Sequence, residues 1–291
     1  MKARKAYSLT ELLLIIGLIA VLLALLLPAV QKVRETAVRL SCQNKVRQVA
    51  LGIVNYTTAH DDKLPPPPGH LTPPPPFAYF DPPGRPAVFP ELWPFVSGGS
   101  SVDHSNSTVY RCPADNSFKS VGRLAWPVQY SEPVTYCLNY HILWGNNRPE
   151  AFSVHSTTLS SYVTDGLSST AIIRERYQWC KDTWRPMSRQ FTDWDGPTFL
   201  FIANDIPIIT VGSPLRTTTA HFPGVPYPPG ATFQPQPPLD RCHPGMTQGL
   251  HAAGQVQGMC DGSVRILSPR VSDWVYWGQA TPNAGDQCAD D

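Results

Sequence analysis

Polar and apolar residues divide the start of the chain into two stretches of different character. The first is an almost unbroken apolar run, Leu12–Val30, which is interrupted by Gly17 and Pro28 and preceded by a short basic leader at residues 1–6. A helix rises about 1.5 Å per residue, so a run of about twenty apolar residues is long enough to cross a bilayer. The pattern therefore predicts a transmembrane helix over residues 7–30.

The second stretch, residues 31–62, mixes charged and apolar positions at helical spacing. Val46, Val49 and Ile53 recur three or four residues apart and lie on one apolar stripe. Such a stripe is typical of a helix that packs on a neighbouring domain. We expect this amphipathic helix to continue the first one as a single rod and to end before the prolines that follow.

The remaining chain, residues 63–291, has the pattern of a β-rich head. Short runs rich in Val, Ile, Phe or Tyr are bounded by Pro, Gly, Asn and Asp, which is typical of antiparallel strands joined by turns. The predicted strands are Ser107–Cys112, Val134–Tyr140, Thr170–Arg174, Phe199–Ile202, Ile206–Val211 and Ser263–Leu267, with Asp-Gly turns at Asp165, Asp195 and Asp261. The predicted fold class is α+β: a long N-terminal transmembrane α-helix packed on a loop-heavy antiparallel-sheet head.

Two segments of the head are rich in proline, residues 64–90 and 222–244. Proline lacks a backbone N–H and favours extended polyproline geometry, so we expect both segments to be semi-rigid surface loops. The alternative is that the first of them is a docking ligand for an aromatic groove on a partner.

Charge and cysteine content indicate which partners and which cellular compartment to expect. The 291 residues carry a formal net charge of +1, and loss of the three basic residues of the leader would change +1 to −2. No basic patch indicates a nucleic-acid partner. The seven cysteines show no C-x-x-C spacing and are Cys42, Cys112, Cys137, Cys180, Cys242, Cys260 and Cys288. Disulfides are their expected use in an envelope protein, with Cys42 on the helix as the expected unpaired thiol.

The junction between the leader and the apolar run resembles the processing signal of type IV prepilins and type II secretion pseudopilins. The stretch Ala6-Tyr7-Ser8-Leu9-Thr10-Glu11 leads directly into the apolar run. The resemblance implies that prepilin peptidase cleaves between Ala6 and Tyr7 and that the new N-terminus is methylated. It further implies that Glu11 pairs with the amine of a neighbouring subunit, and that Pro28 loosens the helix. Ala6 departs from the glycine usual before the cut. A plain signal anchor and a cleaved signal peptide are the alternatives.

The C-terminal region resembles one pseudopilin-like bacterial family of unknown detailed function. Nine residues separate His251 from Asp261-Gly262, which matches the His-x9-Asp-Gly signature of that family. We interpret His251, Asp261 and Gly262 as a structural turn with a hydrogen bond between the first two side chains. The alternative is a metal site that adds His243 to the pair.

No cofactor is expected, with calcium as the alternative because some type II pseudopilins bind it near the C-terminus. Asp273 and Asp286 are the calcium candidates, without EF-hand spacing. We expect that the protein is not an enzyme, since the sequence contains no catalytic motif. Cys260 lies nine residues after His251, but we expect it in a disulfide rather than as a nucleophile.

These features predict a structural subunit of a pilus or of a type II secretion-like pseudopilus. Its partners would be prepilin peptidase, other pilin-like subunits and the membrane. It would cross the inner membrane once, with the head on the periplasmic or extracytoplasmic side. The alternative is an envelope binding module, anchored by the helix, that captures glycans or proteins and does not polymerise.

Overall fold

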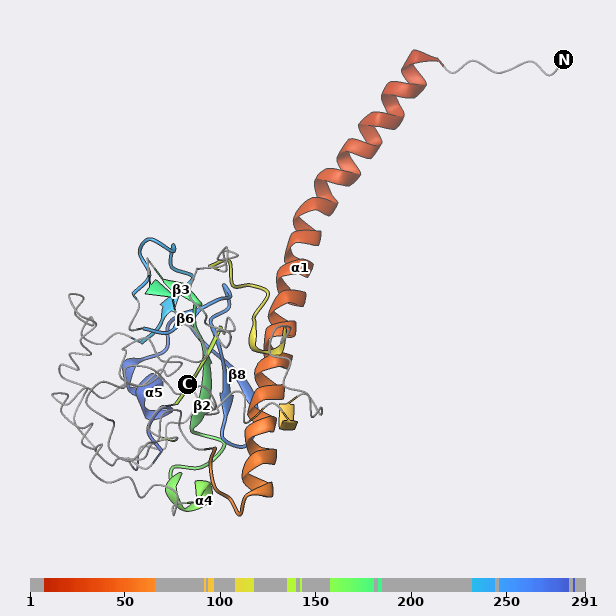
Figure 1. The fold of residues 1–291 in the computed structure, drawn as a ribbon. Helices are drawn as coiled ribbons and strands as arrows, with labels where there is room; N and C mark the ends of the chain where they lie inside the picture. The colour runs from red at the N-terminus through yellow and green to blue at the C-terminus, as the bar shows by residue number, and fades with distance from the viewer. Residues whose placement is uncertain are drawn as a thin grey trace, which may run out of the picture. The chain divides into compact units, whose positions relative to one another are not determined.

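The chain is an α+β protein, as predicted: one long N-terminal helix and an antiparallel sheet of four strands (Figure 1). The fold is that of a computed structural model. It describes residues 8–65, 92, 94–96, 108–117, 135–139, 142, 158–180, 183–184, 232–243, 246–282 and 285. The predicted strands at 199–202 and 206–211, the turn at Asp195, residues 66–90 of the first loop and residues 222–231 and 244 of the second lie outside this part of the chain.

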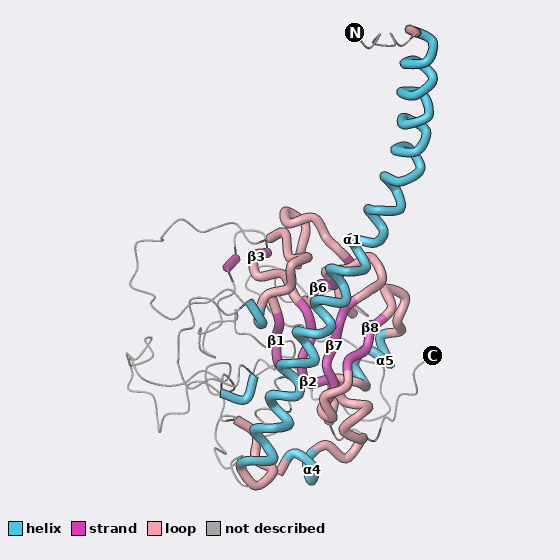
Figure 2. Tube along the Cα trace, turned by 90° about the vertical axis from the view of Figure 1, so that its right-hand side faces the viewer, coloured by secondary structure: helices cyan, strands magenta, loops and turns pink. Residues whose placement is uncertain are grey.

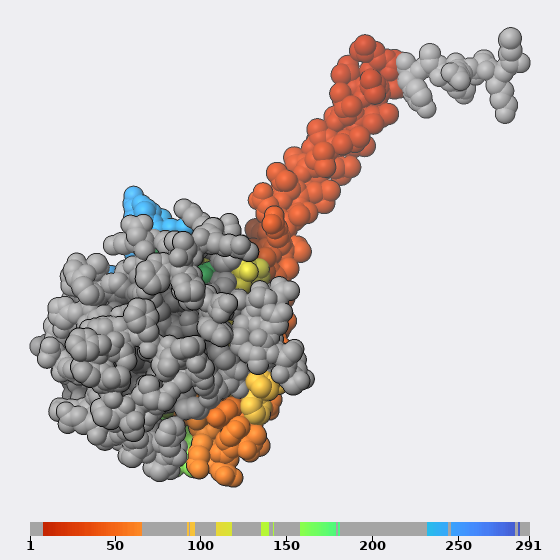
Figure 3. All heavy atoms as spheres, viewed as in Figure 1, coloured from red at the N-terminus to blue at the C-terminus, as the bar shows by residue number. Residues whose placement is uncertain are grey.

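Helix α1 spans Leu9–Ala59 as one α-helix of 51 residues. Its apolar half is long and hydrophobic enough to cross a membrane, a property shared by membrane anchors and signal sequences. Residues 8–37 are exposed along their whole length, and Figure 3 shows their atoms in red. The chain divides into two compact units, residues 1–40 and 41–291, so the boundary between the units falls inside α1.

Two aspartates end the helix. Asp61 and Asp62 have positive φ angles of 54° and 63°, a left-handed conformation that stops a helix and that aspartate tolerates better than most residues. The carbonyl of Asp62 accepts a hydrogen bond from the N–H of Leu159 at 2.8 Å, and its carboxylate accepts one from the N–H of Ser160 at 3.0 Å. The end of α1 is thereby tied to helix α4, Leu159–Tyr162.

The main sheet has the strand order β1-β2-β7-β8, and every neighbouring pair is antiparallel. Its strands are β1 Tyr136–Leu138, β2 Ala171–Glu175, β7 Gln255–Met259 and β8 Val264–Leu267. Strands β1, β2 and β8 confirm the predictions at 134–140, 170–174 and 263–267. The central strand β7, rich in glutamine and glycine, was not predicted, because it lacks the β-branched and aromatic residues that mark strands.

The prediction of a strand over Ser107–Cys112 is wrong. Thr108–Tyr110 form the short 3-10 helix η2 instead, followed by a turn. The N–H of Cys112 donates to Oγ1 of Thr135 at 2.6 Å, and the N–H of Thr135 donates to the carbonyl of Tyr110 at 3.0 Å. These tertiary hydrogen bonds outweigh the local β propensity of the segment.

Short elements complete the described part of the head. Two small sheets pair β3 with β4 and β5 with β6, and helix α5 follows β8. Their bounds are β3 Trp179–Cys180, β4 Thr183–Trp184, β5 Gln234–Pro235, β6 Gln248–Gly249 and α5 Asp273–Gly278.

The main sheet is covered on both faces. The part of α1 that begins at Ser41 crosses one face (Figure 2), and α5 lies against the other (Figure 1). The predicted stripe Val46, Val49 and Ile53 is buried in the core on the α1 side, whereas Tyr276 and Trp277 of α5 belong to a second buried cluster. The head is therefore a three-layer arrangement in which β2 and β7 have no solvent-facing side, as their uninterrupted burial shows.

Helix α1 packs directly on strand β7 at Gly258. A Cβ atom at this position would lie 2.6 Å from Cγ2 of Ile173 and 3.1 Å from both Cβ of Ala50 and Cγ1 of Val46. Real Cβ atoms do not tolerate the first of these distances. Glycine is therefore required at this position so that the helix can lie directly on the backbone of the central strand.

We predict that Gly258→Ala destabilises the head by about 1–3 kcal/mol, the usual cost of inserting a methyl group into a packed core. Urea unfolding of the full chain in detergent, followed by near-UV circular dichroism, measures the loss. Leucine lacks the Cγ2 methyl that makes the closest contact, so Ile173→Leu should reduce the loss when it is combined with Gly258→Ala. An equal loss in both backgrounds would contradict this account of the contact.

Candidate functional site at the junction of helix and sheet

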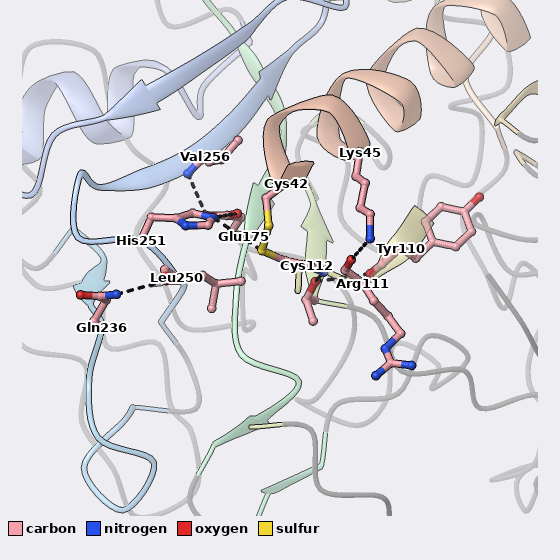
Figure 4. The surroundings of a disulfide bond; sticks show 11 residues. Cys42, Lys45, Tyr110, Arg111, Cys112, Glu175, Gln236, Leu250, His251 and Val256 are labelled. Carbon is pink, nitrogen blue, oxygen red and sulfur yellow. Dashed lines mark hydrogen bonds and ion pairs between the residues drawn. A yellow bond between two sulfur atoms is a disulfide. The ribbon is translucent and has the colours of Figure 1, made fainter. Parts of the chain in front are cut away.

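A disulfide joins α1 to the head. Cys42 of α1 is bonded to Cys112 in the segment after η2, with the two Cα atoms 5.1 Å apart and both side chains buried (Figure 4). One turn along the helix, Nζ of Lys45 donates a hydrogen bond of 2.9 Å to the carbonyl of Arg111. The expectation that Cys42 is the unpaired cysteine is wrong, because the docked helix turns this residue toward the head and not toward solvent.

A buried ion pair lies beside this disulfide. Glu175 ends strand β2 and is fully buried, and its Oε1 lies 3.3 Å from Nε2 of His251. The same Nε2 is 3.5 Å from Sγ of Cys112, and Oε2 of Glu175 accepts a hydrogen bond of 2.9 Å from the N–H of Val256. Burial raises the pKa of Glu175, while the contacts with His251 and Val256 act in the opposite direction. The four groups form one cluster, Cys42, Cys112, Glu175 and His251, called below the junction cluster (Figure 4).

A tight turn places His251 in this cluster. His251 and Gly254 form an isolated antiparallel bridge, and the N–H of Gly254 donates to the carbonyl of His251 at 3.0 Å. Gly254 has a φ of +133°, and a Cβ there would collide with the carbonyl oxygen of Leu267. The turn therefore requires glycine, and it holds the imidazole at the start of β7.

The structure separates His251 from Asp261, and the predicted hydrogen bond between them is wrong. Strand β7 lies between the two residues, and five residues at about 3.4 Å each span roughly 17 Å. Asp261 instead accepts a hydrogen bond of 2.8 Å from the N–H of Ser263 and stabilises the turn to β8. Gly262 has a φ of +83°, and a Cβ there would meet Cδ2 of Leu51 on α1 at 2.7 Å. The signature therefore marks two contacts with the helix, one at each end of β7.

Strand β2 carries a second buried charge on its other face. Nε of Arg174 donates to Oε1 of Gln257 at 3.1 Å, and Nη2 donates to the carbonyl of Tyr276 at 2.9 Å. The guanidinium also lies over the ring of Tyr276, 4.0 Å from its centroid. Because adjacent residues of a strand point to opposite faces, Arg174 anchors α5 and Glu175 faces α1.

The other site residues predicted from sequence lie apart from the junction cluster. Glu11 and Pro28 belong to the exposed half of α1, and Asp273 lies in the first turn of α5. Ala6, Tyr7 and Asp286 lie outside the described residues, so processing and calcium binding stay predictions. Glu175 was not predicted as a site residue from the sequence. The signal that could have indicated it is the charged pair Arg174 and Glu175, which directly follows the apolar run Ala171–Ile173.

Cys260 is a free cysteine, so the expectation that it lies in a disulfide is wrong, and its thiol is a poor nucleophile. It is buried at the far end of β7 from His251, so the two do not form a catalytic pair. Burial, with a smaller effect of Asp261, raises the pKa of the Cys260 thiol far above its ordinary value. A thiol held in its neutral form reacts slowly, because the thiolate is the reactive species.

The fold defines an α+β protein whose head is built around the second half of one long N-terminal helix. A model of the family described as protein of unknown function (DUF1559) matches residues 31–273. The chain belongs to this family, which is found in bacterial proteins with pilin-like signatures. No curated protein and no solved structure matches the chain.

We predict that His251→Ala destabilises the head by about 3–5 kcal/mol at neutral pH, since breaking a buried ion pair leaves a charge without its partner. Loss of the imidazole should raise the pKa of Glu175 further above its ordinary value of 4.5. Below that value the carboxyl group is protonated in the folded and unfolded chains alike. The deficit of the variant should therefore shrink at low pH and grow as the pH rises through and above 4.5.

Urea unfolding of the full chain across this pH range is the measurement. The double variant His251→Ala, Glu175→Gln is the control, because it removes the buried charge and should recover part of the stability at neutral pH. A deficit of the same size at every pH would show that His251 acts through packing alone.

Proposed function

We propose that this protein is a pilin-like subunit that assembles through the first half of α1 into a pilus or a type II secretion-like pseudopilus. The observation that carries the proposal is a single helix whose apolar side chains are exposed from residue 9 to residue 33. Leu14, Leu25 and Leu27 are 65–71% exposed. A continuous apolar surface of this length requires lipid or other helices around it.

Glu11 distinguishes assembly from simple anchoring. In the single chain, Oε2 of Glu11 accepts a hydrogen bond of 3.0 Å from the N–H of Ser8, and the N–H of Thr10 lies 3.4 Å from Oγ of Ser8. This arrangement is a capping box, which stabilises the start of a helix and works with glutamine as well as glutamate. In a packed filament the carboxylate would be surrounded by apolar helices, where a charge requires a cationic partner. The amine of a processed Tyr7 from a neighbouring subunit would be that partner.

Pro28 supports the same proposal. It lies inside α1 and cannot donate the helical hydrogen bond to the carbonyl of Ala24. The helix is therefore weakened near the end of the apolar run. A local loosening would let each subunit adjust its helix among its neighbours without disturbing the docked part beyond Ser41.

We predict that the protein recovered from membranes of cells with prepilin peptidase begins at Tyr7 and carries one added methyl group. Intact-mass and N-terminal analysis measures this outcome, and cells without the peptidase are the control. A chain that still begins at Met1 in both strains would favour an anchored module that captures ligands without polymerising. Cleavage after Val30 would exclude both functions.

We predict that Glu11→Gln abolishes or strongly reduces filament formation while leaving the helix and its membrane insertion intact. Glutamine preserves the capping box but removes the charge, so the variant separates the two roles of Glu11. Sheared-filament yield, compared with the amount of protein in the membrane, is the measurement. Glu35→Gln, on the exposed face of the same helix, is the matched control. Normal assembly of Glu11→Gln would show that Glu11 serves only as a cap.

A further inference from the structure

We propose that the junction cluster is a zinc-type metal site when its disulfide is reduced. Each of Cys42, Cys112, Glu175 and His251 offers one ligand atom, and these four atoms all lie within 4.8 Å of one another. All four side chains are at most 3% exposed. The ligands come from α1, the segment after η2, strand β2 and the turn before β7. Within the described residues, no other group of three or more His, Cys, Asp or Glu side chains meets at such distances.

The spacing around His251 already fits a tetrahedral ion. Zinc binds imidazole nitrogen at about 2.0–2.1 Å, carboxylate oxygen at about 2.0–2.2 Å and thiolate sulfur at about 2.3 Å. A tetrahedron with these bonds places nitrogen about 3.5 Å from sulfur and about 3.4 Å from oxygen. Nε2 of His251 lies 3.5 Å from Sγ of Cys112 and 3.3 Å from Oε1 of Glu175. The two sulfur atoms would have to separate to roughly 3.7 Å, which requires their bond to be broken.

The carboxylate already faces the imidazole. Oε1 of Glu175 is fully buried and lies 3.3 Å from Nε2 of His251. Metal ligands bind in their deprotonated form, so an ion between these two atoms would replace the proton that the pair shares. Two thiolates, one imidazole and one carboxylate form a donor set that favours zinc, whereas calcium prefers oxygen ligands alone.

The exchange between the two states balances in electrons and protons. A dithiol, as the reductant, supplies two electrons and two protons to the Cys42–Cys112 bond and becomes a disulfide itself. The two resulting thiols then lose their protons to solvent as the divalent ion binds, and the proton between Nε2 of His251 and Oε1 of Glu175 is released with them. The helix α1 stays fastened to the head in both states, by sulfur–sulfur bonding or by the metal.

The second disulfide provides a control within the same chain. Cys180 and Cys242 are bonded and buried, but neither belongs to a group of metal-binding side chains within the described residues. Reduction should therefore create a metal site at the junction cluster and not at this pair. The variant Cys180→Ser, Cys242→Ser removes two thiols while leaving all four proposed ligands in place.

The test is titration of the full chain in detergent with Co²⁺, a spectroscopic substitute for zinc, before and after reduction by a phosphine. The phosphine takes up oxygen from water as it reduces the disulfide and is a poor competitor for the ion. We expect no binding to the oxidised chain. The reduced chain should bind one ion, with thiolate-to-cobalt charge transfer and the visible bands of tetrahedral cobalt, and the variant Cys180→Ser, Cys242→Ser should do the same.

Single-ligand variants separate the proposed site from binding by thiols alone. His251→Ala and Glu175→Gln keep both cysteines and should each lower the affinity for Co²⁺ at least about ten-fold. Unchanged affinity in both variants would overturn the proposal, because the metal would then be bound by thiols without the cluster.

Circular dichroism of the reduced chain measures whether the head stays folded without its disulfides, with and without the metal ion. If the reduced wild-type head loses its structure without metal and regains it with one equivalent, folding is coupled to the site and the proposal is supported. If the reduced head stays folded yet binds no ion, or stays unfolded with the ion present, the proposal is wrong.

Discussion

The contact on which the structure depends is the approach of helix α1 to the backbone of strand β7 at Gly258. A helix normally packs on the side chains of a sheet, but here Val46 and Ala50 lie against a residue without a side chain. This contact favours one position of the helix along the sheet, since a shift of one turn, about 5.4 Å, would replace Ala50 over the glycine by the larger Val46 or Val54. Cys42 and Leu51 occupy their places at the two ends of β7 because the middle of the strand is fixed in this way.

Buried polar groups then make this position specific. A purely apolar interface tolerates sliding, whereas the Cys42–Cys112 disulfide and the hydrogen bond from Lys45 to the carbonyl of Arg111 hold α1 in one position. Arg174 does the same for α5 on the opposite face. The pair of Glu175 and His251 joins β2 to the turn before β7 beside this disulfide. Burying charged groups costs desolvation energy. Their role is therefore to select one packing arrangement rather than to add net stability.

The sequence patterns predicted the parts of the fold that follow from local periodicity. The apolar run, the stripe of Val46, Val49 and Ile53, and three of the four strands of the main sheet were all visible. The fourth strand, β7, was not visible in the sequence because its two glutamines and one glycine are dictated by contacts on both of its faces. The partner of His251 could not be predicted for a similar reason, since Glu175 is 76 residues away in sequence and only the sheet order brings the two together.

The two halves of α1 need different surroundings, and the family match includes the second half but not the apolar run of the first. The match covers residues 31–273, which include Cys42, Gly258 and the whole His251–Gly262 signature but not the apolar run. The matched region therefore contains the second half of the helix together with the head that it packs on. The apolar half needs lipid or neighbouring helices whatever the head does. If lipid or neighbouring helices hold the chain by that half alone, any force on it enters the head through the helix, and Cys42 is the first buried residue of the helix.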